Sequence, residues 1–199
     1  MPREFYEVDA ETLARRLLGQ RLVSQVGGCR VAGQIVETEA YLGTPDRAAH
    51  TYGGRRSSRN AAMWGPAGHA YVYFVYGMHH CVNVVASAPG DPVAVLVRAL
   101  EPSEGLDVMR QRRPAARRDR DLCSGPGKLT AALAISRELD GADLVGGRDL
   151  FLERLRHRAL PDRAIGRGPR VGIDYAEEWR DAPLRFWVAG NPHVSTAAR

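Results

Sequence analysis

Apolar residues recur at helical spacing near the start of the chain and at strand spacing through its middle. In VDAETLARRLLGQ, Leu13 and Leu17 share a helical face, Asp9 is a suitable N-cap, and Gly19 is a typical helix stop. Short β-type runs separated by Gly and Pro follow: RLVSQV, RVAGQIVETEAYL, HAYVYFVYGM, CVNVVAS and PVAVLVRALEP. This pattern predicts one amphipathic helix followed by an antiparallel sheet.

The second half of the chain mixes both patterns. Ser103 is a candidate N-cap for a short helix ending near Arg112, and GKLTAALAISREL predicts another helix from Gly127 to Leu139. Farther on, the runs DLFLE, PRVGID and PLRFWVAG predict three more strands. The sequence has no internal repeat and no long linker, so residues 1–199 are expected to form a single α+β domain.

Two carboxylates stand inside an apolar run in QIVETEAYLG. If this run is a regular strand, its side chains alternate between two faces. The core-facing set would be Val36, Thr38, Ala40 and Leu42. The opposite set would be Ile35, Glu37, Glu39 and Tyr41. Carboxylates in an apolar setting usually have a partner or a chemical role, so the opposite set is a candidate site; an ordinary exposed strand face is the alternative.

Tyrosines cluster in YVYFVYGMHH. Tyr71 and Tyr73 share a strand face by period two, whereas Tyr76 precedes Gly77, where the chain can turn, and is expected at a hairpin tip. An aromatic ring exposed at such a tip usually has a function, although the strand preference of aromatics alone would also place tyrosines here. Together with the acids, these tyrosines favour an enzyme that stacks one nucleobase between aromatic rings.

The charge of the chain is compatible with a nucleic-acid partner. Its net charge is +5, and Lys128 is the only lysine, so 27 of the 28 basic residues are arginine. Arginine forks suit phosphate groups. The run RQRRPAARRDRD, with six arginines between Arg110 and Arg120, is interpreted as a solvated loop in preference to a dedicated phosphate contact.

Composition makes several classes of protein improbable. An apolar content of 44% is enough for a sizeable core. The three cysteines are widely spaced and form no C-x-x-C pair, so neither a disulfide framework nor a four-cysteine metal site is expected. The N-terminus lacks an apolar signal region, and no apolar run approaches the roughly 20 residues that cross a bilayer. We expect no membrane association and a reducing, intracellular compartment.

Several longer motifs resemble one known family. They are IVETEAYLG with a histidine nine residues after its tyrosine, GGRRSSRNAAM, YVYFVYGMHHCVNV, LVRALEP, LCSGPGKL and PRVGIDYAEEW…PLRFWVAGNPHVS. Over nearly the whole chain they resemble the alkyladenine (3-methyladenine) DNA glycosylase family of the mammalian type. The resemblance implies an α+β fold with a curved antiparallel sheet, flanking helices and a protruding β-hairpin. It also implies a monofunctional glycosylase of base excision repair, which flips alkylated or deaminated purines out of duplex DNA and hydrolyses the N-glycosidic bond.

The same resemblance implies roles for individual residues. Glu39 corresponds to the general base that activates the attacking water, while Arg98 and the backbone of Val171 correspond to groups around that water. Residues that correspond to the base pocket are Tyr41, His50, Tyr73 and Asn83, the last disfavouring the guanine amino group. Residues that correspond to DNA contacts are Tyr76, which intercalates, and Arg55, near the lesion. Glu37 corresponds to no catalytic residue.

The implied partner is double-stranded DNA containing damaged purines, bound by a monomer without cofactor or metal. The implied location is cytoplasmic and nucleoid-associated in a bacterium, or nuclear in a eukaryote. Hydrolysis of an N-glycosidic bond passes through an oxocarbenium-like sugar, which one carboxylate can stabilise while it takes a proton from water. The preference among 3-methyladenine, 7-methylguanine, hypoxanthine and ethenoadenine as substrates depends on pocket volume, which sequence motifs do not encode.

Two other functions remain open at this point. A non-catalytic nucleic-acid-binding module would stack a base without cutting it, but an acid such as Glu39 in its pocket would oppose phosphate charge. A bifunctional glycosylase/lyase needs an amine, which Pro2 or Lys128 would supply. SGPGKL lacks the first glycine and the Ser or Thr of a phosphate loop, and the consecutive ligands His79, His80 and Cys81 alternate faces, so no metal is expected.

Overall fold

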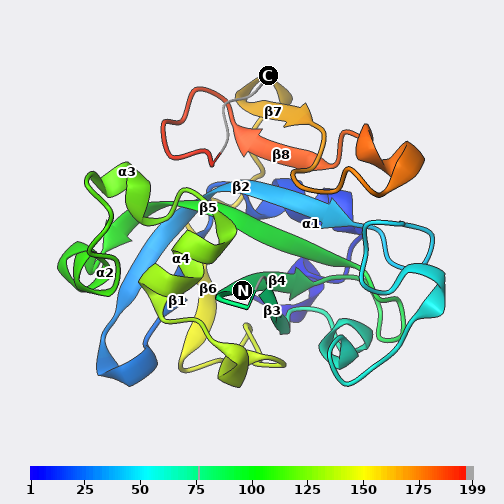
Figure 1. Ribbon diagram of the computed structural model, residues 1–199, viewed down its shortest axis with the longest axis horizontal. Helices are drawn as coiled ribbons and strands as arrows, with labels where there is room; N and C mark the ends of the chain where they lie inside the picture. The colour runs from blue at the N-terminus through cyan, green and yellow to red at the C-terminus, as the bar shows by residue number, and fades with distance from the viewer. Residues whose placement is uncertain (76, 196–199) are drawn as a thin grey trace.

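A computed structural model of the chain describes residues 1–75 and 77–195, and an antiparallel sheet organises them (Figure 1). The strands are β1 (Arg21–Ser24), β2 (Val31–Tyr41), β3 (Ala70–Val75), β4 (His79–Val85), β5 (Ala94–Glu104), β6 (Leu150–Glu153), β7 (Ile165–Gly168) and β8 (Arg185–Val188). Their main order is β3-β4-β5-β2-β1-β6, with β8 pairing both β2 and β7. The helices are α1 (Ala10–Leu17), α2 (Leu106–Arg112), α3 (Asp119–Leu122) and α4 (Pro126–Leu133).

The sheet divides at β2. One side of β2 pairs with β5 along most of its length. On the other side, Val31 to Gln34 pair with β1, whereas Glu37 to Glu39 pair with β8. The two partner strands leave β2 in different directions, so the sheet curls. This confirms the predicted α+β class and the curved antiparallel sheet; β3 and β4 form the predicted hairpin, on which Phe74 and Met78 are 44% and 69% exposed.

The first helix forms as its sequence predicts. The Asp9 carboxylate caps it by accepting hydrogen bonds from the Thr12 amide at 2.8 Å and the Thr12 hydroxyl at 2.7 Å. Its buried side includes Leu13, Ala14 and Leu17, which belong to the main apolar core together with side chains from β2, β4 and β5. Packing of this face against the sheet stabilises the short helix, which would be marginal alone.

Irregular pairing between β2 and β5 changes which residues of the acidic stretch face the core. Ile35 pairs with Leu100 and Thr38 with Val97, while the register skips Val36 on β2 and Arg98 on β5. A skipped residue is a β-bulge, and it reverses the alternation of faces beyond it. Ile35 and Ala40 therefore both lie in the core cluster. The expectation that Ile35 shares a face with Glu37, Glu39 and Tyr41 was wrong for this reason.

Three predicted element boundaries were also wrong. Strand β5 runs through Ser103 to Glu104, and Gly105 is the N-cap of α2. Glycine is favoured at this cap because its φ is +70° and because the Arg30 carbonyl oxygen would lie only 2.6 Å from a Cβ. Helix α4 stops at Leu133 because Ala134 adopts a left-handed conformation and Ile135 donates back to the Thr130 carbonyl at 2.8 Å.

The third boundary concerns the strand before β8. The structure has irregular, bent backbone across PRVGID, and β7 lies earlier, over the glycine-containing segment IGRG. Gly166 lies against the Trp187 ring on β8, where a Cβ would come within 2.2 Å of ring atoms. The close approach explains why a segment with two glycines, which the sequence pattern passes over, pairs as a strand.

The arginine-rich run is partly ordered by its own acids. Arg110 pairs with Asp107 at 2.6 Å and with Asp119 at 2.8 Å, and Arg118 pairs with Asp121 at 2.9 Å. Arg113 donates to the Asp121 and Leu122 carbonyls, which end helix α3. The run therefore contains a helical turn, and several of its charges are neutralised within the segment.

Candidate active site

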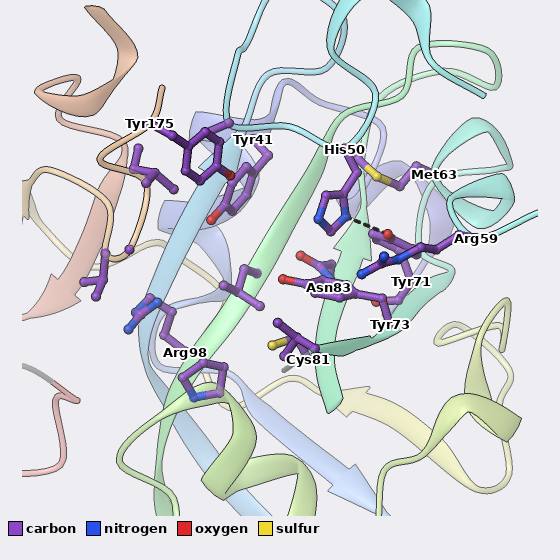
Figure 2. Close-up of a pocket in the computed structure, with 17 residues that line it drawn as sticks. Tyr41, His50, Arg59, Met63, Tyr71, Tyr73, Cys81, Asn83, Arg98 and Tyr175 are labelled. Atoms are coloured by element: carbon purple, nitrogen blue, oxygen red, sulfur yellow. Dashed lines mark hydrogen bonds between the residues drawn. The ribbon is translucent and has the colours of Figure 1, made fainter. Parts of the chain in front are cut away.

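A cavity of about 210 Å³ opens where β2, β5 and the β3–β4 hairpin meet (Figure 2). Tyr41 on β2 and Tyr175 lie on one side of it, and His50, Tyr71, Tyr73 and Asn83 lie on the other. Further lining residues are Ala48, Arg59, Met63, Val75, Cys81, Leu96, Arg98, Pro126, Val171, Gly172 and Ile173. The cavity is therefore built by segments distant in sequence, which the curl of the sheet brings together.

The hairpin side of the cavity is aromatic. Tyr71 and Tyr73 stack with their ring centroids 5.3 Å apart, and His50 meets the Tyr73 ring edge-on at 4.6 Å. The Tyr71 hydroxyl and His50 Nδ1 are 2.8 Å apart. Asn83 Nδ2 donates to the Tyr71 carbonyl at 3.0 Å, which leaves its amide oxygen available to the cavity.

The ionisable groups of this aromatic wall are neutral at pH 7. Burial lowers the pKa of His50 below its usual 6.5, and the positive charge of Arg59 lowers it further. Burial also raises the pKa values of Tyr71 and Tyr73 well above 10. A ring entering here would meet neutral aromatic faces, with the Arg59 guanidinium as the charged lining group on this side.

The opposite side of the cavity contains buried charge. Arg170 and Asp46 form an ion pair with both side chains 0% exposed, and the two contacts are 2.5 Å and 2.9 Å long. The Arg170 guanidinium also lies 4.7 Å from the centre of the Tyr41 ring. Tyr41 is fixed between this cation and Glu39, and burial, followed by the Glu39 charge, raises the pKa of its hydroxyl well above 10.

Glu39 is fully buried directly behind the lining residues. Its Oε1 accepts from the Val171 amide at 2.7 Å and lies 3.3 Å from Arg98 Nη1. Its Oε2 accepts from the Tyr41 hydroxyl at 3.0 Å. A carboxylate offers about four acceptor positions, so these three contacts leave one position on Oε2 for a water molecule. A water that reaches this position would lie within hydrogen-bonding distance of a carboxylate able to take its proton.

Arg98 connects Glu39 to a second buried acid. Arg98 Nε donates to Glu37 Oε1 at 3.0 Å, and Nη2 donates to the Ser195 hydroxyl at 3.3 Å. Burial by itself would lower the pKa of Arg98, but the charges of Glu39 and Glu37 outweigh it and raise that pKa above its usual value. Arg98 is therefore a permanent cation beside the Glu39 carboxylate.

The structure brings most of the predicted site residues together. Tyr41, His50, Tyr73, Asn83, Arg98 and Val171 line one cavity, with Glu39 behind it. Arg55 is exposed after the turn Tyr52–Gly54 and does not line the cavity. Tyr76 lies outside the described residues.

Sequence reasoning missed several residues of the cavity. Period two placed Tyr71 beside Tyr73, but the family resemblance assigned it no role in the pocket. Arg59 and Tyr175 had no such signal, and neither did the Arg170–Asp46 pair, whose members are 124 positions apart. Tyr175 is 67% exposed at the cavity mouth, where only the tertiary fold places it.

The described part of the chain contains neither a metal-binding cluster nor a membrane-spanning helix. Within residues 1–75 and 77–195, no three or more His, Cys, Asp or Glu side chains gather in a group that could hold a metal ion. Among the helices described, none is long and apolar enough to cross a membrane.

Fold and cavity define a class of protein in which a curved antiparallel sheet places aromatic side chains beside a buried carboxylate and a buried arginine. The sequence profile of the methylpurine-DNA glycosylase family matches residues 4–192. The chain belongs to this family.

Individual relatives agree with that assignment. A protein from Clostridium acetobutylicum, provisionally named a 3-methyladenine DNA glycosylase, is 47% identical over 97% of this chain and 96% of its own length. The DNA-3-methyladenine glycosylases of Homo sapiens and Mus musculus are each 46% identical over 98% of this chain, which covers 68% and 61% of those proteins.

Proposed function

We propose that the protein is a monofunctional DNA glycosylase that hydrolyses the bond between a damaged purine and its deoxyribose in duplex DNA. The observation that carries the proposal is the Glu39 carboxylate, held by Val171, Arg98 and Tyr41 behind an aromatic cavity, with one acceptor position left for water. Family membership supports DNA as the substrate and base excision repair as the process.

The two sides of the cavity suit the two parts of the reaction. The rings of Tyr41, His50 and Tyr73 would stack on a flipped purine, and a purine alkylated at N3 or N7 is cationic, which strengthens stacking on electron-rich rings. On Glu39, a bound water would lose a proton as it attacks the sugar C1′, and the carboxylate would stabilise the positive sugar. Bond cleavage needs no amine in this scheme.

The positions of the candidate amines favour hydrolysis over a lyase reaction. Lys128 is exposed on α4, whereas Pro126 of the same helix lines the cavity. Pro2 is exposed and does not line the cavity. We expect no enzyme–DNA adduct to be trapped by borohydride, and we expect strand scission only after alkali. A trapped adduct would replace the hydrolytic scheme with the lyase one.

The decisive experiment is single-turnover base release by Glu39→Gln. The substrates are four duplexes, each with a single 3-methyladenine, 7-methylguanine, hypoxanthine or ethenoadenine. Comparing the wild-type rates on the four duplexes also ranks these lesions as substrates. We expect Glu39→Gln to bind the preferred duplex like the wild type but to release base about 10²–10⁴-fold more slowly. Glu7→Gln, at an exposed position, is the matched control and should keep the wild-type rate. Release at the wild-type rate by Glu39→Gln would favour another base, and no release by the wild type would favour a binding module.

A further inference from the structure

Glu37 is the buried acid for which neither the sequence nor the proposed chemistry gives a role. It is 0% exposed, on β2, two residues before Glu39. Three cationic or N–H groups contact its carboxylate: Arg98 Nε at 3.0 Å, Arg185 Nε at 2.9 Å, and the Ser195 amide at 2.6 Å. A buried carboxylate with so many contacts is energetically balanced and geometrically fixed.

One guanidinium group lies between the two acids. Arg98 contacts Glu37 through Nε, Glu39 through Nη1 at 3.3 Å, and the Ser195 hydroxyl through Nη2. Because a guanidinium is planar and its N–H groups point in fixed directions, holding Nε on Glu37 also fixes the direction of Nη1. The orientation of Arg98 toward Glu39 is therefore set by a residue that does not line the cavity.

The two acids also compete for the same cation. If Glu37 released Nε, the Arg98 fork could turn and form a two-pronged pair with Glu39, which is the geometry that arginine and carboxylate prefer. That pair would use the remaining acceptor position on Glu39 Oε2, where the water has to bind. Glu37 thus holds Arg98 in a one-pronged contact with the base.

Two bulges make this arrangement possible. The β2–β5 register skips Val36 on β2, immediately before Glu37, and it skips Arg98 on β5. The two bulges therefore lie on either side of the Glu37–Ala99 pair. On the far side, the Ser195 amide and hydroxyl contact Glu37 and Arg98 respectively. The segment Asn191 to Ser195 is thereby held against the same pair of side chains, with Asn191 Nδ2 donating to Glu101 at 2.8 Å.

We infer that Glu37 is a positioning residue for base release, which acts by holding Arg98 in a one-pronged contact with Glu39. The inference rests on the proposed function. It predicts an effect on the rate of base release at saturating enzyme and none on lesion affinity, because the aromatic wall does not include Glu37 or its other partner Arg185.

The test uses variants that keep every charge in the buried cluster. Glu37→Asp shortens the acid by one methylene, and Arg98→Lys keeps a cation but removes the fork. We expect Glu37→Asp to slow single-turnover release by about 10- to 100-fold, as for a small displacement of a catalytic group, at unchanged lesion affinity. In the Arg98→Lys background, the same Glu37→Asp change should slow release no further.

Two controls separate positioning from general damage. Glu101→Asp shortens the other acid that holds the segment Asn191 to Ser195 and should release base at the wild-type rate, and thermal unfolding of each variant is the second control. The inference is overturned if Glu37→Asp has the wild-type rate, if it slows the Arg98→Lys protein by the same factor, or if Glu101→Asp slows release equally. If Glu37→Asp does not fold, Arg98→Lys alone tests the inference. Base release by Arg98→Lys at the wild-type rate would then overturn the inference. Failure of the wild type to release any base would instead refute the proposed function.

Discussion

The two walls of the cavity differ in the interactions that hold them, aromatic packing in one and buried ion pairs in the other. The hairpin wall, formed by His50, Tyr71, Tyr73 and Asn83, is aromatic and contains no buried charge, although the exposed Arg59 lies at its side. The opposite wall is backed by six buried acidic and basic side chains, namely Glu37, Glu39, Asp46, Arg98, Arg170 and Arg185. Stacking tolerates small shifts of a ring, whereas a proton transfer needs an acid at a fixed distance. Under the proposed function, recognition falls to the adaptable wall and bond cleavage to the wall that ion pairs hold rigid.

The largest expected effect on stability comes from breaking the charged wall at Asp46. Asp46→Asn leaves the buried Arg170 cation without its counter-charge, so we expect the free energy of unfolding to fall by about 3–5 kcal/mol. Urea denaturation measures the change. The control is Asp162→Asn, which removes an ion pair with Arg15 in which the acid is 89% exposed, and which should cost at most about 1 kcal/mol. If the free energy of unfolding fell equally in the two variants, the buried ion pair would contribute no more to stability than the exposed one.

A smaller effect is expected from the aromatic wall, and on a different quantity. Tyr73→Ala should weaken binding of lesion DNA by about 1–3 kcal/mol, because one stacking surface is lost. The rate of base release from the saturated complex should change much less. Affinity is measured by titrating labelled lesion duplex, and Tyr52→Ala, a partly exposed tyrosine under Arg47, is the matched control. A rate that falls as much as the affinity would show that the two walls do not act separately.

The smallest effect concerns pH and His50. Because the folded-state pKa of His50 lies below 6.5, the unfolded chain binds a proton more readily than the folded one. The contribution of His50 to stability is therefore complete above about pH 6.5 and is lost as the pH falls through its folded-state pKa. Unfolding measured from pH 8 to pH 5 should show a steeper acid loss for the wild type than for His50→Asn. If the free energy of unfolding of the two proteins changed with pH in parallel, the lowered pKa of His50 would be contradicted.

Local rules predicted the parts of the fold that depend on neighbouring residues. Asp9 as a cap and Leu13 and Leu17 as a buried face are statements about one turn of helix, and both were correct. The end of α4 was missed because Ala134 adopts a left-handed conformation without the glycine that usually signals it. Ile135, the next residue, is buried in the core, a placement that only the tertiary fold determines.

The candidate site divides in the same way. Periodicity could place Glu39 with Tyr41 and Tyr71 with Tyr73, because each pair lies on one strand. The choice of Glu39 over Glu37 came from the family resemblance, and geometry adds the reason that Glu39 contacts the lining residues Tyr41 and Val171. Ion pairs between distant segments, such as Asp46 with Arg170, leave no periodic signal in the chain.

The skipped residue Val36 has a consequence for what defines such a site. If Val36 were instead paired as a regular strand residue, strict alternation from Ile35 would turn Glu37 and Glu39 toward Ala14 on α1 and would turn Thr38 and Ala40 toward the cavity. The face that the two acids occupy therefore depends on leaving one backbone residue out of the ladder, and no choice of side chain at positions 37 and 39 replaces it. The wall that contains Glu39 is thus defined by strand register as much as by its side chains.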